Sequence, residues 1–332
     1  MNAAVKRMRG LLDRPGTAMT ILISDPLFQR HDTGRHPEQP ARLAVIQSRL
    51  ENAGLVAQCQ AGTYTPLSED DVRAIHAPEV VIAARRLAEA GGGWLEADTF
   101  VCPESFKVAL ASAGAAASAV DHVLSGEDRT ALCLVRPPGH HATAQKSMGF
   151  CLFNNVALAA QHARKRFGLE RILIVDWDVH HGNGTQDIFW TDPGVFFVSI
   201  HRFGNGFYPG SGDDDETGTG PGLGATVNVP VHFGTSRPDY RALFRNAVEK
   251  AADMIKPELI LLSAGFDAHR LDPIGSLGLE AEDFADMTKT LRAIADVHSK
   301  GRLVSCLEGG YNLQALAECV QAHLEVLVSA EC

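Results

Sequence analysis

One stretch near the middle of the chain, residues 171–185, constrains the fold more than any other. Its first half, from Leu173 to Val175, is continuously apolar, which is typical of a parallel strand covered on both faces. Asp176, Asp178 and His180 follow directly. Residues two apart on an extended chain point the same way, so these three side chains are expected on one face. Polar groups just beyond the carboxyl end of a strand indicate a site in an open α/β sheet.

The acidic pair and the histidine have two explanations. In the first, Asp176 and Asp178 only cap a helix after the turn, and His180 is a satisfied buried histidine. In the second, they bind a metal ion, since Asp and His are ligands that Zn²⁺ accepts. Burying three polar groups without partners is costly, and Gly182 and Gly184 let the backbone turn sharply straight after the cluster. The sequence therefore favours a metal site.

Composition places the chain among large single-domain α/β proteins. Its 332 residues exceed the typical domain, but a hydrophobic fraction of 45% is enough for a substantial core. The net charge is -10 and the basic residues are scattered, which argues against direct nucleic-acid binding and is compatible with a cationic substrate. A negative charge that only aids solubility is the simpler explanation.

Cysteines and apolar runs bear on the cellular location. The seven cysteines are an odd number without a CxxC pair, as expected of reduced thiols in a cytoplasmic protein. No apolar run approaches the ~20 residues that span a membrane, so no membrane partner is expected. Residues 1–18 lack the apolar core of a signal peptide. We predict a disordered extension over residues 1–18 and a single domain over residues 19–332.

Strands and helices alternate along the chain. Apolar runs predict strands over 20–24, 130–135, 173–175, 195–201, 259–263 and 303–306, and helical spacing predicts helices over 41–53, 78–90, 103–125, 240–255 and 280–297 and one ending near 167. Residues 202–224 hold eight glycines and an acidic run, which predicts a long surface loop. This order, without a linker or repeat, predicts one parallel sheet with helices on both faces.

Polar residues follow four of the predicted strands at the point where each strand ends. They are His140 and His141, the cluster that begins at Asp176, then Asp267, and finally Tyr311. The carboxyl ends of parallel strands meet at one edge, so these groups can come together. Asp178, His180 and Asp267 then give three protein ligands and leave a position for water and substrate, which is the pattern of a catalytic zinc site. The choice between Zn²⁺ and Fe²⁺ stays open, because availability as well as affinity decides it.

The other groups supply acid–base chemistry around such a metal. A bound dication lowers the pKa of its water to about 7 and polarises a carbonyl. One of His140 and His141 can then take the proton of the attacking water, and the other can donate a proton to a leaving amine. Asp176 is suited to hold one imidazole in its working tautomer, and Asn183 could orient the other without adding charge. Which histidine has which role stays open.

Tyr311 follows a pair of glycines, Gly309 and Gly310. Its hydroxyl is suited to donate a hydrogen bond to an oxyanion, and the flexible pair lets the side chain be aimed. An aromatic ring that only packs on the site is the alternative.

Five motifs carry a resemblance to a known family. They are RPPGHHA at 136–142, GFCLFNN at 149–155, DWDVHHGNGT at 176–185, SAGFDAH at 263–269 and EGGYN at 308–312. Together and in this order they resemble the zinc-dependent histone deacetylase family, in its class II-like branch, over residues 24–327. The resemblance implies an arginase-like α/β fold with an eight-stranded parallel sheet, and it identifies residues 19–332 as a deacetylase-like catalytic domain.

The resemblance implies two bound ions. Zinc would be held by Asp178, His180 and Asp267. A structural potassium ion nearby would be held by Asp176, Asp178, His180, Ser199 and the Ile200 carbonyl.

The resemblance also implies which residues act on the substrate. His140 and His141 would be the acid–base pair, and Tyr311 would donate to the substrate carbonyl. The tunnel for an acyl-lysine would be lined by Phe150, Phe207 and Gly149, and Asp98 would hold the substrate backbone at its rim.

Two positions narrow the substrate. Family members with His in place of Tyr311 are poor catalysts, so Tyr311 predicts a competent deacetylase. The related polyamine deacetylases often carry an acidic gatekeeper just after the Asp-Pro that follows the third ligand. Ile274 occupies that position here, which disfavours acetylpolyamines. The 202–224 loop either closes the pocket or forms a subunit contact, so a homo-oligomer is compatible with the sequence.

We therefore expect a metal-dependent amidohydrolase that removes acetyl or related acyl groups from lysine side chains. The alternative in the same class is a deacetylase of small acetylated amines such as acetylpolyamines. A binuclear ureohydrolase needs a further Asp-x-Asp, where this chain has Asp267, Ala268 and His269. A non-catalytic acyl-lysine binding module would have no use for Tyr311 and both histidines.

Overall fold

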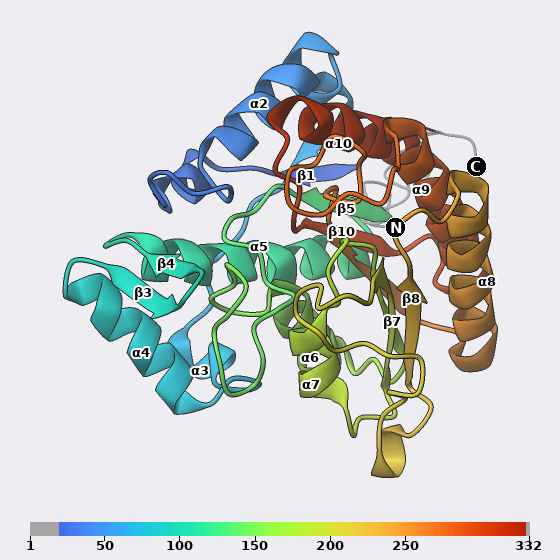
Figure 1. Ribbon diagram of the computed structural model, residues 1–332, viewed down its shortest axis with the longest axis horizontal. Coiled ribbons are helices and arrows are strands. Elements are labelled where there is room, and N and C mark those ends of the chain that lie inside the picture. The colour runs from blue at the N-terminus through green and yellow to red at the C-terminus, as the bar shows by residue number, and fades with distance from the viewer. Residues whose placement is uncertain (1–19, 330–332) are drawn as a thin grey trace, which may run out of the picture.

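An eight-stranded parallel sheet forms the centre of the protein (Figure 1). The computed structural model describes residues 20–329, so the extension predicted for residues 1–18 lies outside the described part. The strand order is β2-β1-β5-β10-β9-β6-β7-β8, and every neighbouring pair is parallel. The strands are β1 (Ile21–Ile23), β2 (Gln60–Ala61), β5 (Thr130–Cys133), β6 (Ile172–Asp176), β7 (Val195–Arg202), β8 (Thr226–Val231), β9 (Leu259–Ala264) and β10 (Leu303–Leu307). The predicted sheet is confirmed, with the eight strands that the resemblance implied.

Helices cover both faces of this sheet. They are α2 (Ala41–Asn52), α3 (Glu69–Val72), α4 (Pro78–Glu89), α5 (Ser105–Ser125), α6 (Asn155–Phe167), α7 (Asn183–Phe189), α8 (Arg237–Ile255), α9 (Ala281–His298) and α10 (Leu313–Val328). The helices α2, α10, α9 and α8 pack against one another in that order, and α5 and α6 pack together on the other side (Figure 1). A small hairpin of β3 (Gly93–Glu96) and β4 (Thr99–Val101) lies beside α4.

The central strands are apolar without alternation because helices cover both of their faces. Every residue of β5, β6, β9 and β10 is buried. β6 lies between β9 and β7 and ends at Asp176. The next residue, Trp177, is fully buried and packs its ring against Phe244 of α8 and Phe284 of α9, with ring centroids 6.0 and 6.2 Å apart. This packing fixes the end of β6, which carries the acidic cluster.

Among residues 20–329, α5 is the one helix long and apolar enough to cross a membrane by length and composition, but 67% of its apolar window is buried in the protein. Its small residues allow close approach of the chain. A side chain on Gly114 would come within 2.2 Å of the Thr65 carbonyl oxygen. The helix therefore has the burial of a core helix.

The sequence analysis did not predict β2, β8 or the β3-β4 hairpin. β2 has only two residues. β8 lies at the edge of the sheet, with residues that alternate between buried and partly exposed, and it contains Pro230. Proline is tolerated on an edge strand because one side of that strand has no ladder to join. Because β8 directly follows the glycine-rich segment, the sequence pattern did not distinguish it from the loop.

The predicted surface loop over residues 202–224 is largely confirmed. β7 runs on to Arg202. After it, the only regular element of the loop is a short 3-10 turn at Gly220–Gly222. The carboxylate of Glu216 accepts hydrogen bonds from the Gly212 amide at 3.0 Å and from Gln186 Nε2 at 2.6 Å. These bonds fix the acidic part of the loop to α7.

A buried histidine makes the stability of this fold depend on pH. His323 of α10 is fully buried, with Nδ1 2.7 Å from Thr288 Oγ1 and Nε2 3.0 Å from Ser305 Oγ. Burial lowers the pKa of His323 from 6.5 to about 3. The folded protein therefore holds this imidazole neutral, while the unfolded chain protonates it below pH 6.5.

We expect the free energy of unfolding to fall between pH 7 and pH 5. Because the folded-state pKa lies below the unfolded value, His323 contributes stability that is present above pH 6.5 and is lost as the pH falls towards 3. The loss over these two pH units is about 2 kcal/mol for one such group. Urea denaturation at both pH values measures it. The loss should be smaller by that amount in His323→Gln, whereas an equal loss in both proteins would contradict the assignment.

Candidate metal and catalytic site

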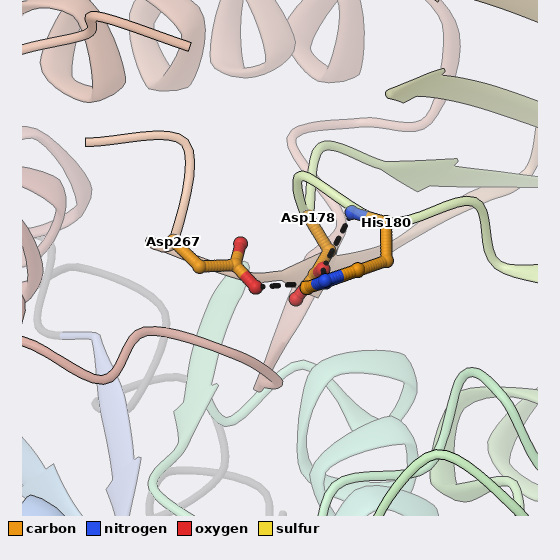
Figure 2. A group of neighbouring side chains, drawn as sticks. All are labelled: Asp178, His180 and Asp267. Atoms are coloured by element: carbon orange, nitrogen blue, oxygen red, sulfur yellow. Dashed lines mark hydrogen bonds and ion pairs between the residues drawn. The ribbon is translucent and has the colours of Figure 1, made fainter. Parts of the chain in front are cut away.

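Three potential metal ligands converge at the carboxyl edge of the sheet. Asp178 and His180 follow β6, and Asp267 follows β9, its neighbour in the sheet. All three are buried, and one ligand atom from each lies within 4.8 Å of the others. His180 Nδ1 is 3.0 Å from Asp178 Oδ1 and 3.1 Å from Asp267 Oδ2. Figure 2 shows the three side chains pointing toward one another. Ligands about 2 Å from a tetrahedral zinc lie only slightly further apart, so the set fits such an ion.

Backbone amides hold the outer oxygen of each carboxylate. The Gly309 amide donates to Asp178 Oδ2 at 2.8 Å, and the Val179 amide donates to Asp267 Oδ1 at 2.8 Å. The other oxygen of each carboxylate faces the His180 ring, and Asp178 Oδ1 also accepts a hydrogen bond from the His180 amide at 2.9 Å. Such bonds orient ligands before a metal arrives.

Two glycines leave room for the carboxylates. A Cβ on Gly265 would lie 2.0 Å from Asp178 Oδ2. A Cβ on Gly309 would lie 2.3 Å from Asp267 Oδ2 and 2.5 Å from Asp178 Oδ2. Any side chain at either position would push a ligand oxygen aside.

The electrostatics of the cluster call for a cation. Burial and the neighbouring Asp178 raise the pKa of Asp267 to about 7. Burial alone would lower the pKa of His180, but its hydrogen bonds to Asp178 and Asp267 raise it to about 9. A positive charge on the imidazole thus compensates two buried carboxylates. A bound dication would supply that charge and leave the imidazole neutral, as a ligand must be.

The predicted histidine pair lies beside this cluster, and each ring has a different partner. His140 Nδ1 is 2.9 Å from Asp176 Oδ2, and His141 Nδ1 is 2.7 Å from Asn183 Oδ1. The two ring centroids are 4.0 Å apart. Burial would lower both pKa values, but Asp176 and Asp178 raise the pKa of His140 well above its ordinary value. Burial and the charge on His140 lower the pKa of His141 well below its ordinary value. The pairings expected for Asp176 and Asn183 are both present.

Glu308 holds the start of the histidine loop, although the sequence analysis gave it no role. Its carboxylate is fully buried and accepts hydrogen bonds from the amides of Gly139, at 2.7 Å, and His140, at 3.2 Å, and from Ser263 Oγ at 3.0 Å. It therefore joins the ends of β5, β9 and β10. Two signals in the sequence could have marked it: Glu308 follows a buried strand, and it is the first residue of the EGGYN motif.

Aromatic rings lie against the cluster and the histidine pair. The ring of Phe207 stacks on His180, with centroids 5.1 Å apart and planes inclined by 7°. Phe150 meets the Tyr311 ring edge-on at 5.7 Å. Tyr208 meets His141 edge-on at 5.0 Å. Burial and the charge of Asp267 raise the pKa of Tyr311 well above its ordinary value, so its hydroxyl remains a donor.

Asp98 and Gly149, two of the predicted substrate-binding residues, lie together, and Ile274 lies on a different loop. Asp98 lies in the turn between β3 and β4, and its Oδ1 accepts a hydrogen bond from the Gly149 amide at 3.3 Å. This brings Asp98 and Gly149 together next to Phe150, whose amide is bonded to Thr99 Oγ1 at 3.1 Å. Ile274 is partly exposed on the loop that follows Asp267.

The residues expected to hold potassium lie side by side. Asp176 of β6 is in register with Ser199 of β7, and Ile200 follows Ser199 in that strand. Asp176 Oδ1 accepts a hydrogen bond from the Asp178 amide at 3.0 Å. Ser199 Oγ lies 2.9 Å from His201 Nδ1. The sheet register and these bonds bring the groups together.

The fold and the site together define a known class of protein. The histone deacetylase domain family matches residues 36–327 of this chain. The chain therefore belongs to the histone deacetylase family, whose members are deacetylase hydrolases.

Particular relatives agree with this assignment. The chain is 41% identical over 301 residues to the human Polyamine deacetylase HDAC10, covering 88% of this chain and 44% of that protein. It is 38% identical over 292 residues to the Histone deacetylase-like amidohydrolase of Pseudomonas aeruginosa, covering 88% of this chain and 77% of that protein. The crystal structure of the HDA15 HD domain matches with a TM-score of 0.90 and 35% identity, over 95% of this chain and 90% of that chain. The chain thus spans less than half of the human relative.

We expect Gly265→Ala to weaken zinc binding by at least about tenfold, because the new methyl group displaces the Asp178 carboxylate. Gly224→Ala is the matched control. Gly224 has a φ of +85° with no neighbouring atom within 4 Å, so alanine there strains the backbone without touching a ligand. Competition with a chelating dye measures the affinity, and circular dichroism checks the fold. Equal zinc affinity in the two variants would contradict the expectation.

Proposed function

We propose that this protein is a zinc-dependent amidohydrolase that removes acetyl or related acyl groups from lysine side chains. The observation that carries the proposal is the buried cluster of Asp178, His180 and Asp267 with a histidine pair and Tyr311 around it. Membership of the histone deacetylase family supports the same chemistry.

The donor set fits one Zn²⁺ per chain on Asp178, His180 and Asp267. When bound, the ion would supply a Lewis acid for the carbonyl and lower the pKa of a bound water to about 7. We also propose a structural K⁺ beside it, held by Asp176, Asp178, His180, Ser199 and the Ile200 carbonyl. The backbone bonds to the two zinc-binding carboxylates support this ligand set, because they fix its geometry in advance.

The hydrogen-bond partners of His140 and His141 indicate which histidine accepts a proton and which donates one. Asn183 is neutral, so His141 is suited to accept the proton of the attacking water. Asp176 is a carboxylate that favours the imidazolium form of His140, which is suited to donate a proton to the leaving amine. The carbon–nitrogen bond of the amide then breaks to give a carboxylate and a free amine.

Tyr311 and the aromatic walls complete the proposal. The Tyr311 hydroxyl donates a hydrogen bond to the carbonyl oxygen as negative charge develops on it. The rings of Phe150 and Phe207 flank the approach and suit the aliphatic stem of an acyl-lysine. Asp98 is the residue that we propose accepts a hydrogen bond from the substrate backbone.

A second candidate substrate class is small acetylated amines. The human relative is named a polyamine deacetylase, and the net charge of -10 suits a cationic substrate. Ile274 argues against this alternative, because it places an apolar side chain where an acidic one would attract a second ammonium group.

Two other functions have less support. A binuclear ureohydrolase needs further carboxylates at the cluster. His269 stands where the second carboxylate would be expected, and its Nε2 contacts Glu280 at 3.2 Å. The described residues contain one potential metal-binding group. A non-catalytic acyl-lysine binding module would not need the paired histidines. The cytoplasmic location, the single catalytic domain over residues 19–332 and homo-oligomer formation stay predictions.

We expect Tyr311→Phe to lower kcat by about 10²- to 10³-fold with little change in KM, because it removes a donor used mainly in the transition state. Steady-state hydrolysis of an acetyl-lysine peptide by zinc-loaded protein measures it. Full activity in the variant would exclude Tyr311 as the oxyanion donor, and an inactive wild type would count against the proposed function.

The substrate class can be tested with acetyl-lysine, trifluoroacetyl-lysine and longer acyl-lysine peptides beside acetylated polyamines. We expect the peptides to be the better substrates. Ile274→Glu should raise kcat/KM for acetylpolyamines by about fivefold, because an exposed ion pair at 4 Å is worth about 1 kcal/mol. Ile274→Gln keeps the polarity without the charge and serves as the control. A wild type that turns over only polyamines would move the function to small amines.

A further inference from the structure

Tyr311 stands on a backbone that does not fix its own conformation. The two preceding residues are glycines, and Gly310 has a φ of +117°, in the left-handed region that favours glycine. The donor must nonetheless reach one place to act on a carbonyl. External contacts must therefore hold this segment.

Separate partners hold successive residues of the segment. The Gly309 amide donates to Asp178 Oδ2 at 2.8 Å, and the Gly310 carbonyl accepts from Arg42 Nε at 2.7 Å. The Tyr311 amide donates to Asp272 Oδ2 at 2.7 Å, and the Asn312 amide donates to the same oxygen at 3.3 Å. Asp272 is therefore the partner that binds the backbone of Tyr311 itself.

The other oxygen of Asp272 binds the loop at the rim. Asp272 Oδ1 accepts hydrogen bonds from the amides of Ile274, at 2.9 Å, and Gly275, at 3.0 Å. The Asp272 side chain is largely buried, at 8% exposure. One carboxylate thus binds four backbone amides, two from each loop. A carboxylate that accepts several amide bonds in a buried place is held strongly.

The loop that carries Asp272 is itself fixed to the metal cluster. The Ser276 amide donates to the carbonyl oxygen of Asp267 at 2.8 Å. A Cβ on Gly275 would lie 2.5 Å from that same carbonyl oxygen. Asn312 Nδ2 also donates to the Leu271 carbonyl at 3.1 Å, which joins the two loops a second time. Asp272 therefore links the backbone of Tyr311 to the loop that is bonded to Asp267, a ligand of the proposed metal.

We propose that Asp272 is the positioning residue for Tyr311, and that its carboxylate couples the place of the tyrosine hydroxyl to the rim loop that carries Ile274. The proposal rests on the proposed function, because it assigns Tyr311 to the reaction. Misplacing a reacting group by 1 Å can cost about 100-fold in rate. A change at Asp272 should act on the reaction mainly through Tyr311.

The first test measures the restraint without any activity. In Asp272→Asn the amide keeps one acceptor oxygen, so it can no longer serve both loops. Hydrogen exchange of the zinc-loaded protein should then be faster by about tenfold or more at the Tyr311 and Asn312 amides or at the Ile274 and Gly275 amides. The Gly309 amide, bonded to Asp178, is the internal reference. Unchanged exchange at all four amides would overturn the proposal.

The second test is a double-mutant cycle on kcat with an acetyl-lysine peptide. Asp272→Asn should lower kcat by about 10- to 100-fold when Tyr311 is present, but by less than about twofold in the Tyr311→Phe background. Asp71→Asn is the matched control, because Asp71 caps α3 by accepting from the Ser68 amide at 3.2 Å and lies outside the site. It should leave kcat unchanged.

The outcomes separate this proposal from the proposed function. If Tyr311→Phe lowers kcat but Asp272→Asn lowers it equally in both backgrounds, Asp272 does not act through Tyr311 and the proposal is wrong. If Tyr311→Phe has no effect, the proposed function loses its oxyanion donor, while hydrogen exchange still decides whether Asp272 holds the segment. Where Tyr311→Phe leaves too little activity for the cycle, the exchange result decides alone.

Discussion

Two buried carboxylates at one edge of the sheet are the constraint on which the rest of the structure depends. Asp178 and Asp267 are both fully buried and lie next to one another across neighbouring strands. Like charges in such a place are costly unless a cation and hydrogen bonds compensate them. Amides of other loops bind the outer oxygens, and Gly265 and Gly309 leave the space that the carboxylates need. The surrounding loops are therefore arranged around a position for positive charge.

The parallel sheet makes this arrangement possible. β9, β6 and β7 are consecutive in the sheet, so residues that follow them lie side by side although they are far apart in the chain. On one side of the β6 end, Trp177 packs into the layer formed by α8 and α9. On the other side, Glu308 joins β10 to the histidine loop after β5. The helical layers fix the strand ends, and the strand ends fix the side chains of the candidate site.

Local patterns were enough to predict the buried strands and the residues that follow them. Leu173 to Val175 is continuously apolar because both of its faces are covered, and the polar residues after it favoured a metal site over helix caps. β8 could not be predicted in this way, because it is a partly exposed edge strand with a proline beside a glycine-rich loop. The eight-stranded count came from the family resemblance rather than from periodicity.

The supporting residues of the site left almost no trace in the sequence. Asp272 and Glu308 act on backbone amides, and an amide is present at every residue except proline, so no side-chain pattern marks their partners. Their partners are also 39 and 169 residues away. Ligands and acid–base groups can be recognised by type, whereas residues that position them are recognised by contacts.

The contrast between Asp176 and Asn183 shows why both kinds of residue are needed. The two histidines are adjacent in the chain and have the same intrinsic chemistry, so any difference between them must come from their surroundings. A carboxylate beside His140 stabilises a positive charge on that ring, and the charge on His140 in turn disfavours a second charge on His141, 4.0 Å away. Asn183 orients His141 without opposing this effect. One charged partner and one neutral partner therefore give two identical side chains opposite shifts in pKa.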